Sequence, residues 1–275
     1  MNEATQSILP ARQPVVFLPH GGGPCFFMNW TWGPADTWNP TKRFLEGLAA
    51  TLPALPRAML VVSGHWEEPA FTASAVARPQ LIFDYSGFPV HTYQLTWPAP
   101  GQPELAARVT SILKDAGLPS AISHTRGFDH GVFVPLKVAF PEAEIPVVTL
   151  SLAASLDPAL HLAAGRALAS LRDEGVLIVA SGMSFHNLSA YFRPETVERS
   201  RAFDSWLGAA VESPASERER LLAVWRQAPF AEFAHPRVEH LIPLMVAAGA
   251  AGEGKGRRVF HDEPMGAAMS AFRFD

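Results

Sequence analysis

Three apolar stretches of the chain each lead directly to a histidine. The stretches at 15–18, 58–62 and 176–180 precede His20, His65 and His186, respectively. If these stretches are neighbouring strands of an open α/β sheet, the three side chains meet beyond the carboxyl ends of the strands, where ligands bind. Neutral imidazoles with an open coordination position are typical of a catalytic Zn²⁺ or a non-haem Fe²⁺. The spacing therefore predicts a site for one divalent metal ion.

Small residues come shortly before two of these histidines. The pair Ser63-Gly64 precedes His65, and the pair Ser181-Gly182 lies a few residues before His186. Because glycine leaves room beside the backbone, we expect these positions to let a bound ion or substrate approach the main chain.

The segment His235–Met245 supplies further candidates. Pro236 suits the first position of a helix, which predicts that Glu239 and His240 lie near the start of a helix that continues to residue 252. Adjacent helical residues point about 100° apart, so only one of the two can face an ion. Pro243 is expected to remove one backbone hydrogen bond and to bend this helix.

Apolar strands alternate with amphipathic helices along the chain. Strands are predicted at 15–18, 58–62, 145–152 and 176–182, and helices at 41–52, 102–117 and 157–175. Strands that are apolar throughout are covered on both faces, which predicts an α/β fold: a three-layer α/β/α sandwich around a central mixed, largely parallel sheet. Residues 1–275 are interpreted as a single domain, with residues 1–13 as a flexible N-terminal extension. His161, in the middle of the third helix, is expected on the surface or at the edge of the core.

The bulk composition narrows the classes of function. The 275 residues are 48% hydrophobic and 17% charged, with a formal net charge of −4, which is typical of a globular protein. This balance argues against nucleic acid or an anionic membrane surface as partner. A single cysteine, Cys25, excludes an intrachain disulfide and suits the cytoplasm. No apolar run approaches the ~18–20 residues of a membrane span, and we expect no signal peptide.

Several short motifs occur in the order typical of one enzyme family. They are HGGGP at 20–24, VVSGHW at 61–66, GFDHGVFVPL at 127–136, SGMSFHNL at 181–188 and EHLIPLMVAAGAAG at 239–252. Together they resemble the DOPA-dioxygenase-type branch of the class III, LigB-like extradiol ring-cleavage dioxygenases, from about residue 15 to residue 270. The resemblance implies a LigB-like catalytic domain that opens a catechol ring, DOPA being one such catechol, with O₂. The implied product is a muconic semialdehyde, and the implied cofactor is one Fe²⁺ or Zn²⁺ in a mononuclear non-haem site.

The resemblance also implies which residues hold the metal ion. It implies His20, His65 and His240 as ligands, with Glu239 as a partner that orients one imidazole. Two histidines and one carboxylate are another common ligand set for non-haem Fe²⁺. Glu239 or His235 in place of His240 therefore stays open as the third ligand.

Two further histidines are implied to act on the substrate. His186 lies over the open face of the metal site and is expected to be the acid/base, with a role as fourth ligand left open. His130 is expected to lie in a loop, because glycines flank the segment Phe128–His130. There it would hydrogen-bond an oxygen of the substrate or of O₂.

Two other functions remain as alternatives. A zinc-dependent hydrolase can use the same histidines through metal-bound water. A non-catalytic scaffold or binding protein can share the fold, although the histidines at all four implied positions favour an enzyme. The choice between Fe²⁺ and Zn²⁺, the particular catechol and the oligomeric state stay open at this point.

Overall fold

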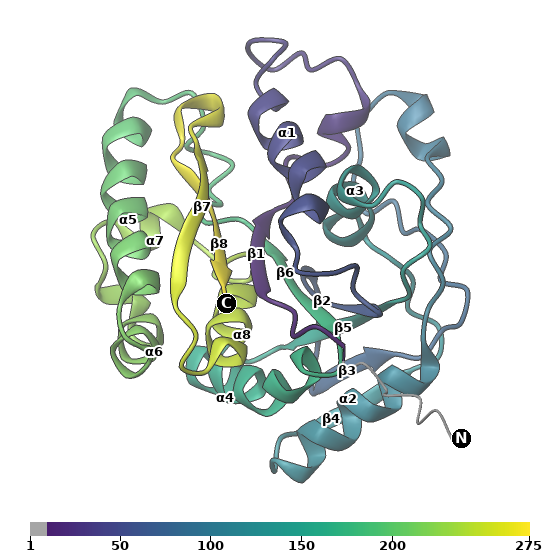
Figure 1. The fold of residues 1–275 in the computed structure, drawn as a ribbon. Coiled ribbons are helices and arrows are strands. Elements are labelled where there is room, and N and C mark those ends of the chain that lie inside the picture. Colours follow the sequence, from purple (N-terminus) through teal and green to yellow (C-terminus); the bar gives the residue numbers. More distant parts are fainter. Residues whose placement is uncertain (1–9) are drawn as a thin grey trace, which may run out of the picture.

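A computed structural model describes residues 10–275, and the eight strands within these residues form one sheet (Figure 1). The strands are β1 Val15–Pro19, β2 Ala58–Glu68, β3 Phe71–Ser74, β4 Ser120–Ser123, β5 Val147–Ala153, β6 Val176–Gly182, β7 Gly256–Asp262 and β8 Met269–Phe274. Their order across the sheet is β4-β3-β5-β2-β6-β1-β8-β7. The central strands β5, β2, β6 and β1 are parallel, whereas β3 with β5, β8 with β1 and β7 with β8 are antiparallel. The prediction of a mixed, largely parallel sheet is confirmed.

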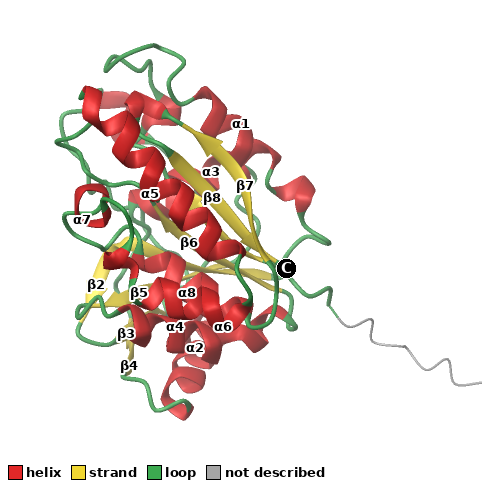
Figure 2. Ribbon diagram, turned by 90° about the vertical axis from the view of Figure 1, so that its left-hand side faces the viewer, coloured by secondary structure: helices red, strands yellow, loops and turns green. Residues whose placement is uncertain are grey.

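Helices cover both faces of this sheet. They are α1 Asn39–Gly47, α2 Pro103–Asp115, α3 His130–Ala139, α4 Pro158–Leu168, α5 Pro194–Glu212, α6 Ala215–Ala223, α7 Ala231–Ala234 and α8 Ile242–Ala251. The helices α1 and α3 contribute to the core on one face, and α2, α4, α5, α6 and α8 contribute to the core on the other. Figure 2 shows the strands lying between these two sets of helices, so the three-layer sandwich is confirmed. No helix within residues 10–275 combines the length and the apolar character that crossing a membrane requires.

The strand β1 shows why the apolar stretches do not alternate between apolar and polar residues. Its residues Val15 and Phe17 join the core on the side of α4 and α8, whereas Val16 and Leu18 join the core on the side of α1 and α3. Successive side chains of a strand point to opposite faces, so a strand covered on both faces must be apolar at every position. All five residues of β1 are buried accordingly.

The N-terminal extension predicted for residues 1–13 falls partly outside the described residues, which begin at Pro10. Gln13 is buried, and its backbone N–H donates to the carbonyl oxygen of Arg172 over 3.0 Å. The side chain of Arg12 forms an ion pair with Asp173. The chain is thus tied to the body of the protein just before β1.

The helix predicted at 157–175 begins as expected. Asp157 caps α4, because its Oδ1 accepts the backbone N–H of Leu160 over 2.7 Å. The α-helix ends at Leu168 and continues as a 3₁₀ turn, Ala169–Arg172. The helix predicted at 41–52 is also shorter, since α1 ends at Gly47 and is followed by the 3₁₀ turn Ala49–Thr51.

The helix predicted to start near Pro236 begins later, at Ile242. A turn precedes it, in which the carbonyl oxygen of Val238 accepts the N–H groups of Leu241 and Ile242 over 2.9 and 3.0 Å. Pro243 therefore lies in the first turn of α8, where a missing N–H leaves no hydrogen bond unmade, so the predicted bend is wrong. Glu239 and His240 lie in the turn before α8 and are not part of the helix.

His161 was expected at the surface or at the core edge, and this prediction is wrong. The side chain is completely buried between α4 and the end of β5. Its Nδ1 donates to the carbonyl oxygen of Asp157 over 2.6 Å, and its Nε2 accepts the backbone N–H of Ala153 over 3.1 Å. Both ring nitrogens are satisfied by backbone groups, and burial lowers the pKa of His161 to about 4.

We expect this histidine to make the stability of the fold depend on pH. Between about pH 6.5 and pH 4 the unfolded chain binds a proton at residue 161 that the folded chain excludes, so the free energy of unfolding falls as the pH is lowered. The shift corresponds to about 3 kcal/mol in all. Denaturant unfolding at several pH values should therefore show a steeper loss for the wild type than for His161→Gln, which keeps a neutral acceptor. Identical pH slopes in the two proteins would show that His161 does not act in this way.

Candidate active site

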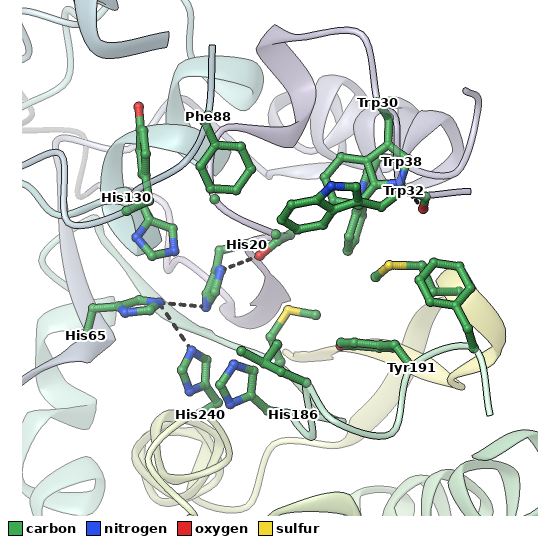
Figure 3. A pocket seen from close by; sticks show the side chains of 18 residues that line it. His20, Trp30, Trp32, Trp38, His65, Phe88, His130, His186, Tyr191 and His240 are labelled. Atoms are coloured by element: carbon green, nitrogen blue, oxygen red, sulfur yellow. Dashed lines mark hydrogen bonds between the residues drawn. The ribbon is translucent and has the colours of Figure 1, made fainter. Parts of the chain in front are cut away.

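Three imidazoles from separate parts of the chain meet at one edge of the sheet. His20 follows β1, His65 lies in β2 where the pairing with β5 is interrupted, and His240 lies in the turn before α8. The Nε2 of His65 is 3.3 Å from the Nε2 of His20 and 3.2 Å from the Nε2 of His240. Figure 3 shows these side chains pointing toward one another. We call His20, His65 and His240 the histidine centre.

The Nδ1 atoms of the histidine centre show where its protons lie. The Nδ1 of His20 donates to the carbonyl oxygen of Gly21 over 2.9 Å, and that of His240 donates to the Oε1 of Glu239 over 2.8 Å. The Nδ1 of His65 lies 3.7 Å from the Oδ2 of Asp84, whose negative charge favours a proton on that nitrogen. These acceptors place the protons on Nδ1 and leave lone pairs on the three Nε2 atoms.

Facing lone pairs at such short distances repel one another unless a cation lies among them. The contacts between the Nε2 atoms therefore suit metal ligands better than hydrogen bonds. Neutral imidazoles, each with its second nitrogen bound to an oxygen, are the usual ligands of Zn²⁺ and non-haem Fe²⁺. The histidine centre thus fits a divalent metal ion.

Burial keeps these imidazoles in the neutral form that binds metal. Desolvation, together with the neighbouring imidazoles, lowers the pKa values of His20 and His65 well below the ordinary value. Desolvation also lowers the pKa of His240, to about 4. Burial raises the pKa of Glu239, but hydrogen bonds from His186 and His240 outweigh burial and hold it well below the usual range. Glu239 is therefore a carboxylate next to the neutral imidazole of His240.

His186 lies against the histidine centre. Its ring stacks on that of His240, with 3.4 Å between the ring centroids and 21° between the planes. Its Nδ1 is 3.4 Å from the Oε1 of Glu239, so one carboxylate contacts both rings. His186, Glu239 and His240 each offer a ligand atom within 4.8 Å of the others, as do His20, His65 and His130. The two clusters meet at the contact between His65 and His240.

The flanking glycines predicted a loop at His130. This prediction is wrong, because His130 is the first residue of α3. Asp129 before it has an extended backbone and ends the preceding segment. The carboxylate of Asp129 accepts hydrogen bonds from Ser63 and Arg126. The ring of His130 lies 4.0 Å from that of His65, measured between centroids, and faces the same cavity.

Asp84 was not among the residues expected at the site. Its Oδ1 accepts both the backbone N–H and the Nδ1–H of His130, over 2.9 and 2.8 Å. Burial raises the pKa of Asp84, but these hydrogen bonds lower it further, so the carboxylate is charged. Asp84 thus orients His130 and lies beside His65 as well. Asp84 lies in an irregular segment. The only feature of the sequence that could have pointed to it is a carboxylate between two aromatic residues, Phe83 and Tyr85.

The small residues near the histidines serve a different purpose from the one expected. A Cβ on Gly182 would lie 2.1 Å from the carbonyl oxygen of His240, and a Cβ on Gly64 would lie 3.1 Å from that of Glu239. The same His240 carbonyl accepts the N–H of Met183 over 3.0 Å. These glycines therefore make room for the backbone of the turn that carries the third imidazole.

His235, the alternative third ligand, is turned away from the histidine centre. Its Nε2 donates to the carbonyl oxygen of Ser184 over 3.0 Å, and its ring packs against Phe203 and Trp225. Burial lowers its pKa to about 3. His235 is part of the packing behind the site.

A cavity of about 490 Å³ opens above the histidine centre. The imidazoles lie on one side of it, and the indoles of Trp30, Trp32 and Trp38 lie on the other (Figure 3). The glycine loop after β1 permits this arrangement, since a Cβ on Gly23 would lie 2.8 Å from the ring of Phe88. In the sequence, the only indication of this aromatic wall is the occurrence of three tryptophans within nine residues, 30–38.

A sheet whose strand ends bring imidazoles together under an aromatic cavity is the architecture of a metal-dependent enzyme acting on a small molecule. The family described as "Catalytic LigB subunit of aromatic ring-opening dioxygenase" matches residues 14–273 of this chain. The chain belongs to this family and is an oxidoreductase, an extradiol aromatic ring-opening dioxygenase. The resemblance drawn from the short motifs is confirmed.

Individual relatives support this assignment. "Dioxygenase tasH" from Hapsidospora irregularis is 38% identical over 275 residues, covering 92% of this chain and 82% of that protein. "4,5-DOPA dioxygenase extradiol" from Beta vulgaris is 40% identical over 239 residues, covering 86% of this chain and 88% of that protein. The solved structure titled "Crystal structure of uncharacterized protein JW3007 from Escherichia coli K12" superposes with a TM-score of 0.78 at 29% identity, covering 96% of this chain and all of that one.

We expect metal binding to depend on the histidine centre. The wild type should bind one divalent ion per chain, whereas His240→Ala and the double variant His20→Ala, His65→Ala should bind none, because each lacks at least one Nε2 ligand. The measurement is elemental analysis of protein purified without oxygen. His124→Ala, which changes an exposed histidine outside the cavity, is the matched control. Equal metal content in the double variant and the wild type would disprove the site.

Proposed function

We propose that this dioxygenase opens a catechol ring beside its two hydroxyls, yielding a muconic semialdehyde, and that His20, His65 and His240 hold the metal ion. The observation that carries the proposal is the convergence of the Nε2 atoms of three histidines at the floor of an aromatic cavity. The proposed ion is Fe²⁺, with Zn²⁺ as the alternative. Bound Fe²⁺ would supply the site at which a catechol chelates and O₂ is activated.

The charge of the ligands favours a catechol over a simple phenol. Three neutral imidazoles do not neutralise a divalent ion, so a substrate that binds through two oxygens and has lost a proton is stabilised electrostatically. The carboxylates of Asp84 and Glu239 are already paired with imidazoles. The substrate is therefore the group that supplies the remaining negative charge.

His186 is the proposed acid/base. Its Nδ1 faces Glu239, which leaves its other ring nitrogen for the substrate in the cavity. In this role His186 accepts the proton that a catechol hydroxyl loses on binding and returns it to an oxygen during ring opening. Glu239 keeps both His186 and His240 oriented through one oxygen atom.

His130 is proposed to bind an oxygen of the substrate or of O₂. Asp84 holds its Nδ1, so the Nε2 is the nitrogen that remains available on the side of the cavity. The two hydrogen bonds from His130 to the same Asp84 oxygen fix both the start of α3 and the ring. A ring held in this way contributes a donor or acceptor in a constant position.

We further propose that one catalytic domain covers the chain and that the enzyme works in the cytoplasm. One sheet unites the strands from Val15 to Phe274, and the family match has nearly the same extent. The single cysteine, Cys25, is buried and lies in a chain that forms no disulfide with itself. This cysteine usage suits a reducing compartment.

The product of the reaction tests the proposed chemistry. With Fe²⁺ and O₂, the protein should convert catechol to a yellow semialdehyde that contains both atoms of labelled O₂, while a monophenol of the same size should remain unchanged. Absorbance measures the formation of the semialdehyde, and mass spectrometry measures the labelled oxygen that it contains. A muconic diacid as product would exclude this mechanism. Failure of protein with verified Fe²⁺ to convert any catechol would favour the zinc hydrolase or the scaffold.

The variant His186→Ala separates a proton carrier from a ligand. We expect it to retain the metal ion and to lose roughly 10²–10⁴-fold in turnover, the usual contribution of a general acid/base. Steady-state kinetics and elemental analysis of the same sample give both values, with His124→Ala again as control. Loss of the metal ion in His186→Ala would make His186 a ligand.

A further inference from the structure

The lining of the cavity carries no formal charge on the side away from the imidazoles. Among the described residues, 18 line the cavity, and apart from five histidines they are glycines and apolar or aromatic residues. Two of them, Tyr85 and Tyr191, carry a hydroxyl; that of Tyr85 donates to the carbonyl oxygen of Thr92 over 2.6 Å, and burial raises the pKa of both phenols, so neither is charged. The substituent of a bound catechol would face this uncharged wall.

The carboxylates behind the imidazoles are not available to a substrate. Asp84 binds His130 and lies beside His65, and Glu239 contacts both His186 and His240. Neither carboxylate lines the cavity. An ammonium or a carboxylate on the substrate would therefore lose its hydration without gaining a partner of opposite charge, which costs free energy.

The mouth of the cavity is apolar as well. Trp32, Leu188 and Phe192 are 56%, 69% and 58% exposed, and all three line the cavity. Among the described residues, eight large hydrophobic side chains are exposed, so more than a third of them surround this one opening. Large apolar side chains gathered at a cavity and left in water are typical of a surface that a ligand covers.

Phe192 is held at the mouth of the cavity in an unfavourable backbone conformation. Phe192 has φ +65° and Met265 has φ +55°, both in the left-handed region that bulky residues avoid. The N–H of Phe192 donates to the carbonyl oxygen of Met265 over 3.1 Å, which ties the two segments together. A Cβ on Gly33, next to Trp32, would lie 3.1 Å from the Phe192 ring. Strained residues that keep an exposed ring in place indicate a functional position.

We propose that the catechol cleaved by this enzyme carries an uncharged, apolar ring substituent, and that Trp32, Leu188 and Phe192 contact that substituent. This inference rests on the proposed ring cleavage and adds the class of substrate. It excludes a zwitterionic amino acid such as DOPA as the preferred substrate of this enzyme. An aryl substituent suits the mouth best, because it can pack against the indole of Trp32 and the ring of Phe192.

A series of catechols that differ mainly in charge tests the inference. The compounds are 4-propylcatechol, dopamine, 3-(3,4-dihydroxyphenyl)propionate and DOPA, which have side chains of similar length. We expect kcat/KM for 4-propylcatechol to exceed that for each of the other three by at least about tenfold, since each buries an unpaired charge. Equal or greater kcat/KM for any charged compound would overturn the inference.

Variants at the mouth locate the effect. For Trp32→Ala and Phe192→Gly, the ratio of kcat/KM for biphenyl-3,4-diol to that for catechol should fall roughly tenfold, mainly through KM. Phe192→Gly also removes the unfavourable backbone conformation, so this variant keeps its fold. Leu55→Ala removes a side chain that is 71% exposed and outside the cavity, and it should leave the ratio unchanged. An unchanged ratio in both mouth variants would refute the contact.

Binding without turnover keeps this test separate from the proposed chemistry. Calorimetry without oxygen measures the affinity of the metal-loaded protein for 4-propylcatechol and for DOPA. If no catechol is cleaved but 4-propylcatechol binds at least about tenfold more tightly, the proposed reaction fails and the substrate class stands. If catechol is cleaved and DOPA binds equally well, the reaction stands and the substrate class fails.

Discussion

Close contacts between imidazole nitrogens impose the main constraint on this structure, since the Nε2 of His65 lies 3.3 Å from that of His20 and 3.2 Å from that of His240. None of these Nε2 atoms can carry its proton inward, so each ring needs an oxygen behind its Nδ1. The backbone of Gly21, the carboxylate of Glu239 and, at a longer distance, Asp84 supply these oxygens. The site therefore consists of the three proposed ligands and of the oxygen acceptors behind them.

The fold meets this constraint by bringing the chain backbone very close to the strand ends. The turn before α8 packs onto Gly64 and Gly182, where a side chain would collide with carbonyl oxygens. The helix α8 itself is buried throughout, and it packs closely on α4: a Cβ on Gly165 would lie 2.1 Å from the carbonyl oxygen of Val246, and a Cβ on Gly249 would lie 2.1 Å from that of Leu162. Small residues thus set the position of His240 from both of its sides.

Polarity is divided sharply across the cavity. On the floor, Asp84 and Glu239 concentrate negative charge behind the imidazoles, which favours a cation among the Nε2 atoms. On the opposite wall, Trp32 and its neighbours are largely apolar and carry no charged group. Such a division fixes the orientation of a ligand that has a chelating end and an apolar end, because each end is stabilised on one side only.

The sequence by itself determined the sandwich, its central strands and the histidine motifs. Apolar runs such as 15–18 and the Asp157 cap act within a few residues of the chain, so their meaning does not depend on distant partners. Only the tertiary structure decided that α8 begins after His240, that His161 is buried and that Asp84 holds His130. Contacts at the site join residues far apart in the chain: Asp84 and His130 are 46 positions apart, and His65 and His240 are 175 positions apart. No local pattern records such contacts, because they form only when the whole sheet has assembled.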